Sequence, residues 1–232
     1  MVTAIVLAAG SGSRMKSSVK KQYMLLNGKP LVYYSLEAFN DCENIDDIIV
    51  VTSEEDLEYF KTEIIDKYNI SKVSNIVAGG KERYNSVYNG LMCIGDSEYV
   101  VIHDGARPFI TVENIDCIVN RVRECKACVA GMPVKDTIKI VDEKNNIAQT
   151  PNRKTVWMAQ TPQAFAKDII MIAYNEMMKA EDDTITDDAM VVEKYYGIDV
   201  NMVECSYNNI KVTTPEDIVI AETFLSRKNS MK

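Results

Sequence analysis

The stretch that decides the fold is VTAIVLAAGSGSRM, residues 2–15. Its first seven residues are apolar apart from one threonine and include several β-branched side chains, which predicts a buried strand. The strand runs directly into a loop that contains Gly10 and Gly12. Glycine allows a tight backbone whose N–H groups can face phosphate oxygens. The sequence therefore predicts a phosphate-binding loop at the end of a first buried strand.

Two familiar nucleotide-binding fingerprints do not fit this loop. A P-loop needs a second glycine, followed by lysine, five residues after Gly10, where Met15 stands. The dinucleotide fingerprint needs a third small residue three positions after Gly12, which is again Met15. The ribose-binding acid of this fingerprint is also expected about 20 residues after the glycines, and Glu54 and Glu55 lie much further along the chain. A dinucleotide-dependent oxidoreductase is therefore disfavoured.

Charge is spread unevenly along the chain. The net charge of −8 is opposite in sign to that of most nucleic-acid binders. Residues 1–36 nevertheless contain no Asp or Glu and carry a charge of +5, which leaves −13 for the remainder. The cations of this segment are Arg14, Lys16, Lys20, Lys21 and Lys29. A positive segment on an acidic protein predicts a small polyanionic ligand rather than a nucleic acid.

The rest of the chain alternates short β-branched runs with amphipathic stretches. Strands are predicted at 2–8, 47–53, 73–79, 98–104, 127–134 and 199–205. Helices are predicted at 31–39, 82–94, about 111–124, near 166–180, at 187–196 and from Pro215 onward. This alternation predicts a single α/β domain over residues 1–232 with a mainly parallel sheet. Ligands of such sheets bind at the carboxyl ends of the strands.

Composition places the chain among ordinary globular proteins. It has 232 residues, of which 47% are hydrophobic and 26% charged. No stretch approaches the ~20 apolar residues that a membrane span needs. The beginning of the chain lacks the basic segment of a signal peptide, and the six cysteines are interpreted as reduced thiols. We therefore expect a cytoplasmic protein without a membrane partner.

The opening loop, followed by Lys-Gln-Tyr at 21–23, resembles the cytidylyltransferases, and among them the 2-C-methyl-D-erythritol 4-phosphate cytidylyltransferase family. The resemblance covers nearly the whole chain. It recurs in AGGKERYNSV (78–87), HDGARPF (103–109), PVKDTIK (133–139), AQTPQAF (159–165), TDDA (186–189) and NIKVTTPED (209–217). It implies a three-layer, Rossmann-like nucleotidyltransferase domain with an inserted β-arm.

The activity implied by the resemblance is transfer of CMP from CTP to 2-C-methyl-D-erythritol 4-phosphate, with release of pyrophosphate and with Mg²⁺ as cofactor. A related enzyme acting on ribitol 5-phosphate shares most of these motifs. The opening motif contains AAG where we expect AGG in the ribitol 5-phosphate enzyme, and residues 103–108 read HDGARP where we expect HDAVRP. Both differences favour 2-C-methyl-D-erythritol 4-phosphate as the acceptor. A nucleotide-binding regulator without catalysis is the alternative from another class of protein, and the set of matched substrate positions disfavours it.

The resemblance also assigns roles to individual residues. Arg14 and Lys21 match the cations that stabilise the transition state, and such stabilisation is usually the largest catalytic contribution. The other positions implied to contact CTP are Ala8, Ala9, Gly10, Gly12, Gly80, Arg83, Ser86 and Asp104. In the family a proline often precedes the matching lysine. Here that position is Lys20, which predicts a more mobile loop and a cation able to replace Lys21 in part.

The acceptor positions follow from the same matches. They are Asp104, Arg107, Thr137, Arg153, Thr161, Thr186 and Lys211, of which Arg153 and Lys211 are also expected to orient the attacking phosphate. Asp104 ends a predicted strand among phosphates and could hold Mg²⁺ directly or through water. Residues 135–156 read as a hairpin, and a two-stranded hairpin is marginal by itself. In the family this arm reaches a second subunit, which implies a homodimer with exchanged arms.

Two further features of the sequence are interpreted as structural. His103 is the chain's only histidine, but a phosphate monoester is already an anionic nucleophile near neutral pH and needs no general base. Cys125 and Cys128 form a CxxC pair. A zinc site needs four ligands, and no compact fourth ligand accompanies them.

Overall fold

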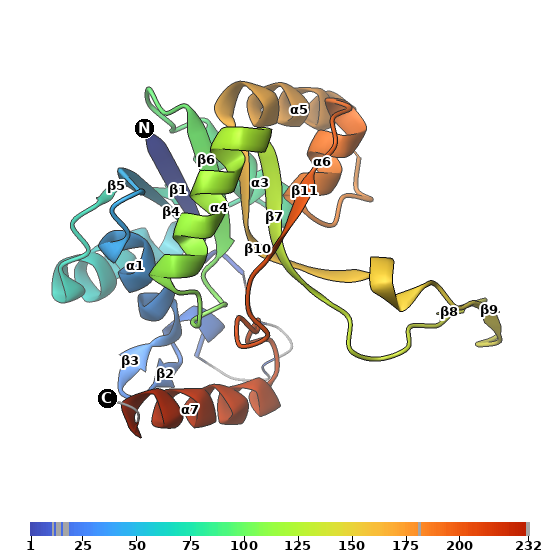
Figure 1. Cartoon of the computed structure of the whole chain (residues 1–232). Helices are drawn as coiled ribbons and strands as arrows, with labels where there is room; N and C mark the ends of the chain where they lie inside the picture. Colours follow the sequence, from blue (N-terminus) through green and yellow to red (C-terminus); the bar gives the residue numbers. More distant parts are fainter. Residues whose placement is uncertain (11, 13–14, 16–18, 181, 231–232) are drawn as a thin grey trace.

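The computed structural model describes residues 1–10, 12, 15, 19–180 and 182–230, the last four as backbone only. A seven-stranded sheet lies between two layers of helices (Figure 1). In spatial order its strands are β11 (Asn201–Glu204), β7 (Ala127–Pro133), β10 (Trp157–Ala166), β6 (Tyr99–Asp104), β1 (Val2–Leu7), β4 (Asp47–Thr52) and β5 (Val73–Ala78). This arrangement confirms the predicted three-layer α/β fold.

Most neighbouring strands in the sheet are parallel. β1 pairs in parallel with β4 and β6, β4 pairs with β5, and β11 pairs with β7. β10 is antiparallel to both of its neighbours, β6 and β7. A helix was predicted near 166–180, and β10 was not among the predicted strands. β10 continues to Ala166 because Gln163–Phe165 pair on both sides of the strand.

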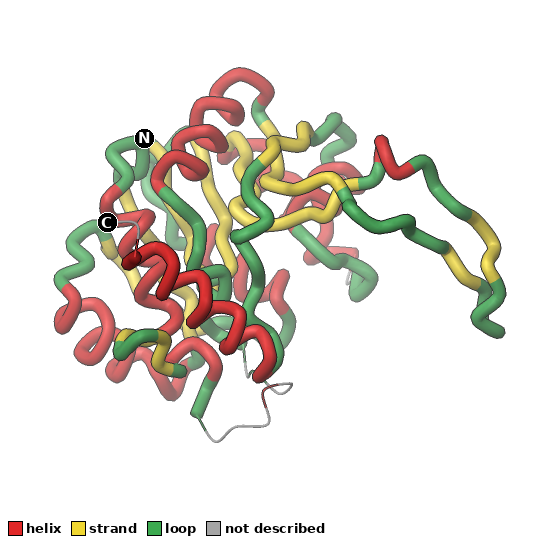
Figure 2. The backbone as a smooth tube through the Cα atoms, turned by 60° about the horizontal axis from the view of Figure 1, so that its bottom comes forward, coloured by secondary structure: helices red, strands yellow, loops and turns green. Residues whose placement is uncertain are grey.

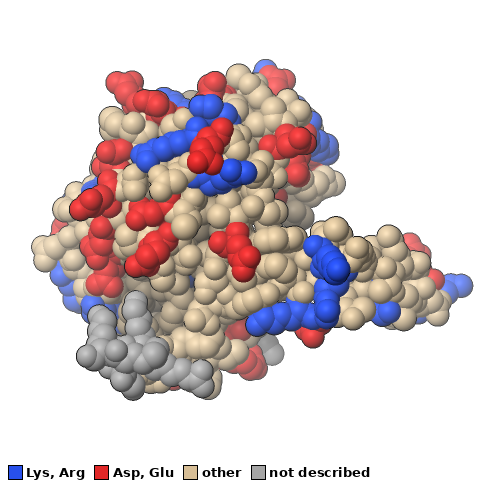
Figure 3. All heavy atoms as spheres, viewed as in Figure 1, with Lys and Arg blue, Asp and Glu red and all other residues tan. Residues whose placement is uncertain are grey.

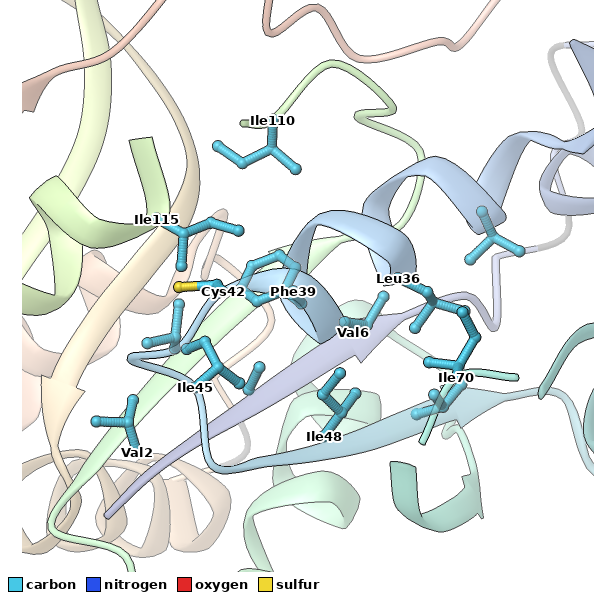
Figure 4. Close-up of a cluster of buried hydrophobic side chains, with 14 of the residues drawn as sticks. Val2, Val6, Leu36, Phe39, Cys42, Ile45, Ile48, Ile70, Ile110 and Ile115 are labelled. Carbon is cyan, nitrogen blue, oxygen red and sulfur yellow. The ribbon is translucent and has the colours of Figure 1, made fainter. Parts of the chain in front are cut away.

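The alternating side chains of β1 show how each face of the sheet is covered. Val2, Ala4 and Val6 pack with the helices of one layer, as Figure 4 shows for part of this cluster, whereas Ile5 packs with those of the other. The first layer contains α1 (Leu31–Asp41), α2 (Leu57–Phe60), which continues as a π-helix over Lys61–Asp66, and α4 (Val112–Cys125). The second contains α3 (Arg83–Leu91), α5 (Lys167–Ala180) and α6 (Asp188–Tyr195).

A small hairpin that the sequence pattern did not predict follows the first loop. Its strands are β2 (Leu25–Leu26) and β3 (Lys29–Pro30). The turn between them contains Asn27 and Gly28 with φ of 50° and 78°, the left-handed conformation that an Asn-Gly pair favours. The last helix, α7 (Pro215–Ser230), packs with Leu26 of this hairpin across the end of the molecule seen at the bottom of Figure 1.

An arm stands away from the body of the molecule (Figure 2). Its tip is a short antiparallel pair, β8 (Ile140–Val141) and β9 (Ile147–Gln149), within the predicted range 135–156. Ile140 and Ile147 on this pair are 48% and 63% exposed. Basic side chains gather where the arm joins the body (Figure 3). Within the described residues, the helices are too short or too polar to cross a membrane.

Candidate active site

A cavity of about 420 Å³ opens at the carboxyl ends of β1 and β6. This is the edge of a parallel sheet at which ligands are expected. Its walls come from four segments: the loop after β1, the loop between β5 and α3, the end of β6 and the loop before α7. The lining residues are Leu7, Ala8, Ala9, Gly10, Gly12, Lys21, Gln22, Gly80, Lys81, Glu82, Arg83, Ser86, Asp104, Ala106, Lys211 and Thr213.

Glycine is required where two of these loops approach each other. A Cβ on Gly79 would lie 2.5 Å from the Cβ of Ala9 and 2.8 Å from Oγ of Ser86. A Cβ on Gly80 would lie 2.3 Å from the Cβ of Asn85. No real side chain tolerates such distances, so the backbone of residues 79–80 fits closely between the first loop and α3. The closeness explains why small residues stand in both segments of the cavity wall.

The start of α3 carries two of the predicted nucleotide-binding residues. Its first turn has a capping box, in which the Glu82 N–H donates to Oδ1 of Asn85 at 3.0 Å. Ser86 is buried, and its Oγ accepts from the Gly80 N–H at 3.1 Å and donates to the Glu82 carbonyl at 3.3 Å. The box places Arg83 at the first position of the helix, with its side chain in the cavity.

Asp104 is the centre of an ionic network on the cavity wall. Its Oδ1 accepts from Nε of Arg83 at 3.1 Å, and its Oδ2 accepts from Nζ of Lys211 at 2.6 Å. Burial alone would raise the pKa of the Asp104 carboxyl, but the two cations outweigh burial and hold it well below its usual range. The carboxylate therefore stays ionised at any physiological pH.

Arg83 is bound by a second carboxylate that sequence reasoning missed. Both oxygens of Asp188 accept from its terminal nitrogens, at 2.9 and 2.8 Å, and Asp188 is fully buried. Burial alone would lower the pKa of Arg83, but Asp188 and Asp104 raise it well above its usual value. The motif TDDA had drawn attention to Thr186 only. The signal available in the sequence was a second acid in that motif.

His103 lies beneath Asp104 and has no access to solvent. Its Nε2 is 3.3 Å from the Arg107 carbonyl, which can only accept, so Nε2 carries the proton. Nδ1 then accepts from Oγ1 of Thr161 at 3.1 Å, and Oγ1 accepts from the Asp104 N–H at 3.0 Å. Burial lowers the pKa of His103 to about 3. Both results agree with the structural interpretation of this histidine.

Lys20 and Lys21 point to different parts of the molecule. Lys21 lines the cavity. Nζ of Lys20 instead contacts Oγ of Ser53 at 2.9 Å and the carboxylates of Glu55 and Asp56 at 2.7 Å each. The expectation that Lys20 could replace Lys21 is therefore wrong for this arrangement, because three partners hold its ammonium elsewhere. Oγ of Ser53 also donates to Oδ2 of Asp56 at 2.7 Å, which joins two of these partners.

The structure brings together most of the predicted nucleotide positions, and fewer of the acceptor positions. Ala8, Ala9, Gly10, Gly12, Lys21, Gly80, Arg83, Ser86, Asp104 and Lys211 line the cavity. Arg14 lies outside the described residues. The other predicted acceptor residues are absent from the described cavity wall: Arg107, Thr137, Arg153, Thr161 and Thr186.

The acceptor residues outside the cavity wall have other neighbours within this chain. Arg107 is half-buried and donates to the Asn209 carbonyl at 2.9 Å, and Thr161 is bound to His103 and Asp104. Thr186 is exposed at the start of α6. Thr137 and Arg153 are exposed on the arm, where Arg153 donates to the Lys135 carbonyl at 3.0 Å. A single chain therefore leaves the arm residues away from the cavity.

Carboxylates suited to a divalent cation are few in the cavity. Among the described residues there is no cluster of three or more His, Cys, Asp or Glu side chains able to hold a metal ion. Asp104 and Glu82 are the acids of the cavity wall. Mg²⁺ is commonly bound by one or two carboxylates together with substrate phosphates and water. The residues therefore fit a cation that arrives with a nucleotide, but they do not form a complete metal site by themselves.

A mainly parallel α/β sheet with a glycine loop and a cluster of cations at its carboxyl edge is the arrangement expected of an enzyme that binds nucleotide phosphates. The family model described as IspD, 2-C-methyl-D-erythritol 4-phosphate cytidylyltransferase, matches residues 2–227. The chain belongs to this family of cytidylyltransferases.

Individual relatives agree with the family match. A 2-C-methyl-D-erythritol 4-phosphate cytidylyltransferase of Lachnospira eligens is 51% identical over 226 residues, which cover 97% of this chain and 99% of that protein. The crystal structure of a 4-diphosphocytidyl-2C-methyl-D-erythritol synthase from Anaerococcus prevotii superposes with a TM-score of 0.87 at 35% identity, covering 97% of this chain and 96% of the other. The crystal structure of the Francisella tularensis 2-C-methyl-D-erythritol 4-phosphate cytidylyltransferase superposes with a TM-score of 0.80 at 30% identity, covering 96% of this chain and 98% of the other.

Proposed function

We propose that this chain transfers CMP from CTP to 2-C-methyl-D-erythritol 4-phosphate. The products are pyrophosphate and 4-diphosphocytidyl-2-C-methyl-D-erythritol, an intermediate of the non-mevalonate route to isoprenoid precursors. The observation that carries the proposal is the set of charged side chains around Asp104. In this member of the family, Arg83, Lys21 and Lys211 line one cavity beside the glycine loop.

The reaction follows from the chemistry of the two phosphates. An oxygen of the acceptor phosphate attacks the α-phosphorus of CTP in line with the bond to the leaving pyrophosphate, which departs with the electron pair of that bond. The acceptor phosphate is already anionic near neutral pH, so no side chain needs to remove a proton. The protein contributes orientation and positive charge, which together can lower the barrier substantially.

Each cation has a place in this scheme. Arg14 and Lys21 stabilise the charge that develops on the triphosphate, while Ala8, Ala9, Gly10, Gly12, Gly80, Arg83 and Ser86 form the nucleotide side of the cavity. Lys211 orients the attacking phosphate from its place beside Asp104. In the free protein its ammonium is bound to Asp104 at 2.6 Å. Binding of the acceptor phosphate would offer Lys211 a second anion beside Asp104.

Mg²⁺ is the cofactor that this chemistry calls for. When bound, it would neutralise charge on the triphosphate oxygens. Asp104, directly or through water, is the residue that would hold it, with Glu82 as the second acid of the cavity. Asp104 is engaged by Arg83 and Lys211 in the free chain. Most of the remaining coordination would therefore come from the nucleotide phosphates and water.

The acceptor side is completed by a second copy of the chain. Thr137 and Arg153 lie on an arm that extends away from its own cavity (Figure 2). Exposed Ile138, Ile140 and Ile147 give the arm an apolar surface that a partner could cover. We propose a homodimer with exchanged arms, in which Arg153 of each arm contacts the acceptor phosphate in the other subunit, with Thr161, Thr186 and Arg107 on the cavity's own side.

The partners in this proposal are small molecules and a second copy, without nucleic acid or membrane. The six cysteines are free thiols, as suits the reducing cytoplasm in which we place the protein. The chain forms one nucleotidyltransferase domain over residues 1–232, with the arm as an insertion. No specific observation favours a regulator without catalysis, and the family match disfavours it.

Pyrophosphate release tests the proposal. Purified protein is supplied with Mg²⁺ and CTP, and with 2-C-methyl-D-erythritol 4-phosphate or ribitol 5-phosphate in separate reactions. We expect rapid release with the first acceptor and at most slow release with the second. Preference for ribitol 5-phosphate would keep the site and change the substrate. Absence of release with both would contradict the proposed function.

A further inference from the structure

Asp188, which the proposed reaction does not use, is the most enclosed acid of the site region. Its side chain is completely buried, at 0% exposure. Two nitrogens of Arg83 donate to it at 2.9 and 2.8 Å, and the Tyr174 hydroxyl donates to its Oδ1 at 2.5 Å. Tyr174 is itself fully buried on α5. The carboxylate is therefore held rigidly by two helices.

The start of α6 fixes where this carboxylate points. Asp187 caps the helix by accepting from the Met190 N–H at 2.9 Å. Gln163 of β10 donates through Nε2 to Asp187 and accepts through Oε1 from the Ala189 N–H, both at 2.9 Å. Gln163 is buried in the central sheet. The sheet thus anchors the residues on both sides of Asp188, through the Asp187 carboxylate and the Ala189 N–H, and the carboxylate of Asp188 faces Arg83.

The two carboxylates together determine the orientation of Arg83. Asp188 binds the two terminal nitrogens, so the remaining Nε–H of the planar guanidinium has a fixed direction. It points to Oδ1 of Asp104 at 3.1 Å. Asp104 then presents its other oxygen to Lys211. The order of contacts, Tyr174 to Asp188 to Arg83 to Asp104 to Lys211, leads from the helix layer to the cavity.

We propose that Asp188 is a positioning residue for the transfer reaction: by holding Arg83, it orients Asp104 and through it Lys211. The proposal rests on the proposed function and adds a residue that contacts neither substrate. A buried ion pair contributes little to stability compared with apolar side chains of the same size. Its effect here is instead to set the direction of charged groups whose placement controls the rate.

The decisive variant is Asp188→Asn, which keeps the shape and removes the charge. Asp182→Asn is the matched control. Asp182 also accepts from a tyrosine hydroxyl, that of Tyr195 at 2.8 Å, and from a cation, Lys194, but it does not contact Arg83. Circular dichroism and thermal unfolding establish that each variant is folded, and kcat is measured with CTP and 2-C-methyl-D-erythritol 4-phosphate.

We expect folded Asp188→Asn to lose about tenfold or more in kcat, within the range that a misplaced active-site group can cost. Asp182→Asn should stay close to wild type. In an Arg83→Lys background, which cannot bridge both carboxylates in the same way, Asp188→Asn should add little further loss. A residue that only stabilises the fold would lower the unfolding temperature, leave kcat of the folded protein unchanged and act independently of Arg83.

Two results would overturn the proposal. One is a wild-type kcat in folded Asp188→Asn, and the other is a double variant with Arg83→Lys whose loss in kcat equals the product of the two single losses. If Asp188→Asn does not fold, Tyr174→Phe and its control Tyr195→Phe carry the same comparison. We then expect a threefold to tenfold loss, on the order of one hydrogen bond, for Tyr174→Phe alone, and an unchanged kcat would overturn the proposal. Wild-type protein without turnover would instead refute the proposed function, so the two failures are distinguishable.

Discussion

Lys211 and Asp104 meet on the wall of the cavity at 2.6 Å, Nζ to Oδ2, although 107 residues separate them along the chain. One residue ends β6 and the other precedes α7. The contact joins two loops at the carboxyl edge of the sheet, and it leaves a cation in the cavity wall whose carboxylate partner is also bound to Arg83. The position of this ammonium group leads to the first prediction.

Lys211→Met should reduce kcat by about 10²-fold, the cost that a misplaced reacting group can have. The variant removes the cation that orients the acceptor phosphate but leaves the nucleotide wall in place. The KM for the acceptor should rise more than the KM for CTP, as steady-state kinetics with each substrate varied will show. Equal changes in the two KM values would contradict an acceptor role.

Lys21→Met and Lys20→Met should behave differently despite their adjacency. Lys21 faces the cavity, whereas the ammonium of Lys20 is bound to Ser53, Glu55 and Asp56. We expect loss of about 10²-fold or more in kcat for the first variant and near wild-type turnover for the second. A comparable loss in both would show that Lys20 acts in catalysis, against its position in the structure.

His103 should make the fold sensitive to mild acid. Burial lowers its pKa to about 3 in the folded protein, whereas the unfolded value is about 6.5. The unfolded state therefore binds more protons between these values, and stability falls as pH drops below about 6.5. From pH 7.5 to 5.5, wild type should lose about 1.4 kcal/mol more unfolding free energy than His103→Asn.

Urea unfolding of both proteins at the two pH values measures this difference. His103 is the only histidine in the chain, so no other imidazole complicates the comparison. An equal loss in wild type and variant would show that the ring takes up a proton as readily in the folded protein as in the unfolded chain. It would also remove the reason for assigning the proton to Nε2 alone.

Mixing two inactive variants tests the arm exchange. Lys21→Met disables a cavity, and Arg153→Met disables an arm. If an arm serves the partner's cavity, a mixed dimer has one site with both defects and one intact site. Random assembly of equal amounts then gives about half mixed dimers and about a quarter of wild-type activity. Each variant alone should stay nearly inactive.

The activity of the mixture must be compared with that of the variants before exchange. A monomer in sedimentation or light scattering, or a mixture no more active than its components, would contradict the exchanged dimer. Full activity of Arg153→Met alone would leave the dimer possible but would remove the arm from the site.

The sequence predicted the parts of the fold that depend on local pattern. The apolar, β-branched runs at 2–8 and 98–104 were sufficient to place two central strands, and glycines at 10 and 12 marked the edge at which the cavity opens. β10 was harder, because a continuous strand through Thr161 and Pro162 is fixed by pairing with neighbours on both sides. Strand pairing of this kind is tertiary information that no local window contains.

The same distinction separates the predicted site residues from the missed ones. Asp104 could be proposed because it ends a strand at the expected edge. Asp188 could not be assigned, because its role depends on Arg83, which is 105 residues away along the chain. Lys20 was misread for a similar reason: its carboxylate partners lie on the next βα connection. Charged side chains are placed by distant partners, and spacing along the chain does not reveal them.

The most direct test of the account follows the oxygen atoms of the acceptor. 2-C-methyl-D-erythritol 4-phosphate, labelled with oxygen-18 in its phosphate, is incubated with CTP, Mg²⁺ and the wild-type protein, and the products are analysed by mass spectrometry. Attack by the acceptor phosphate on the α-phosphorus predicts that all of the label stays in 4-diphosphocytidyl-2-C-methyl-D-erythritol and that pyrophosphate is unlabelled. Label in pyrophosphate, or the absence of 4-diphosphocytidyl-2-C-methyl-D-erythritol among the products, would contradict the account.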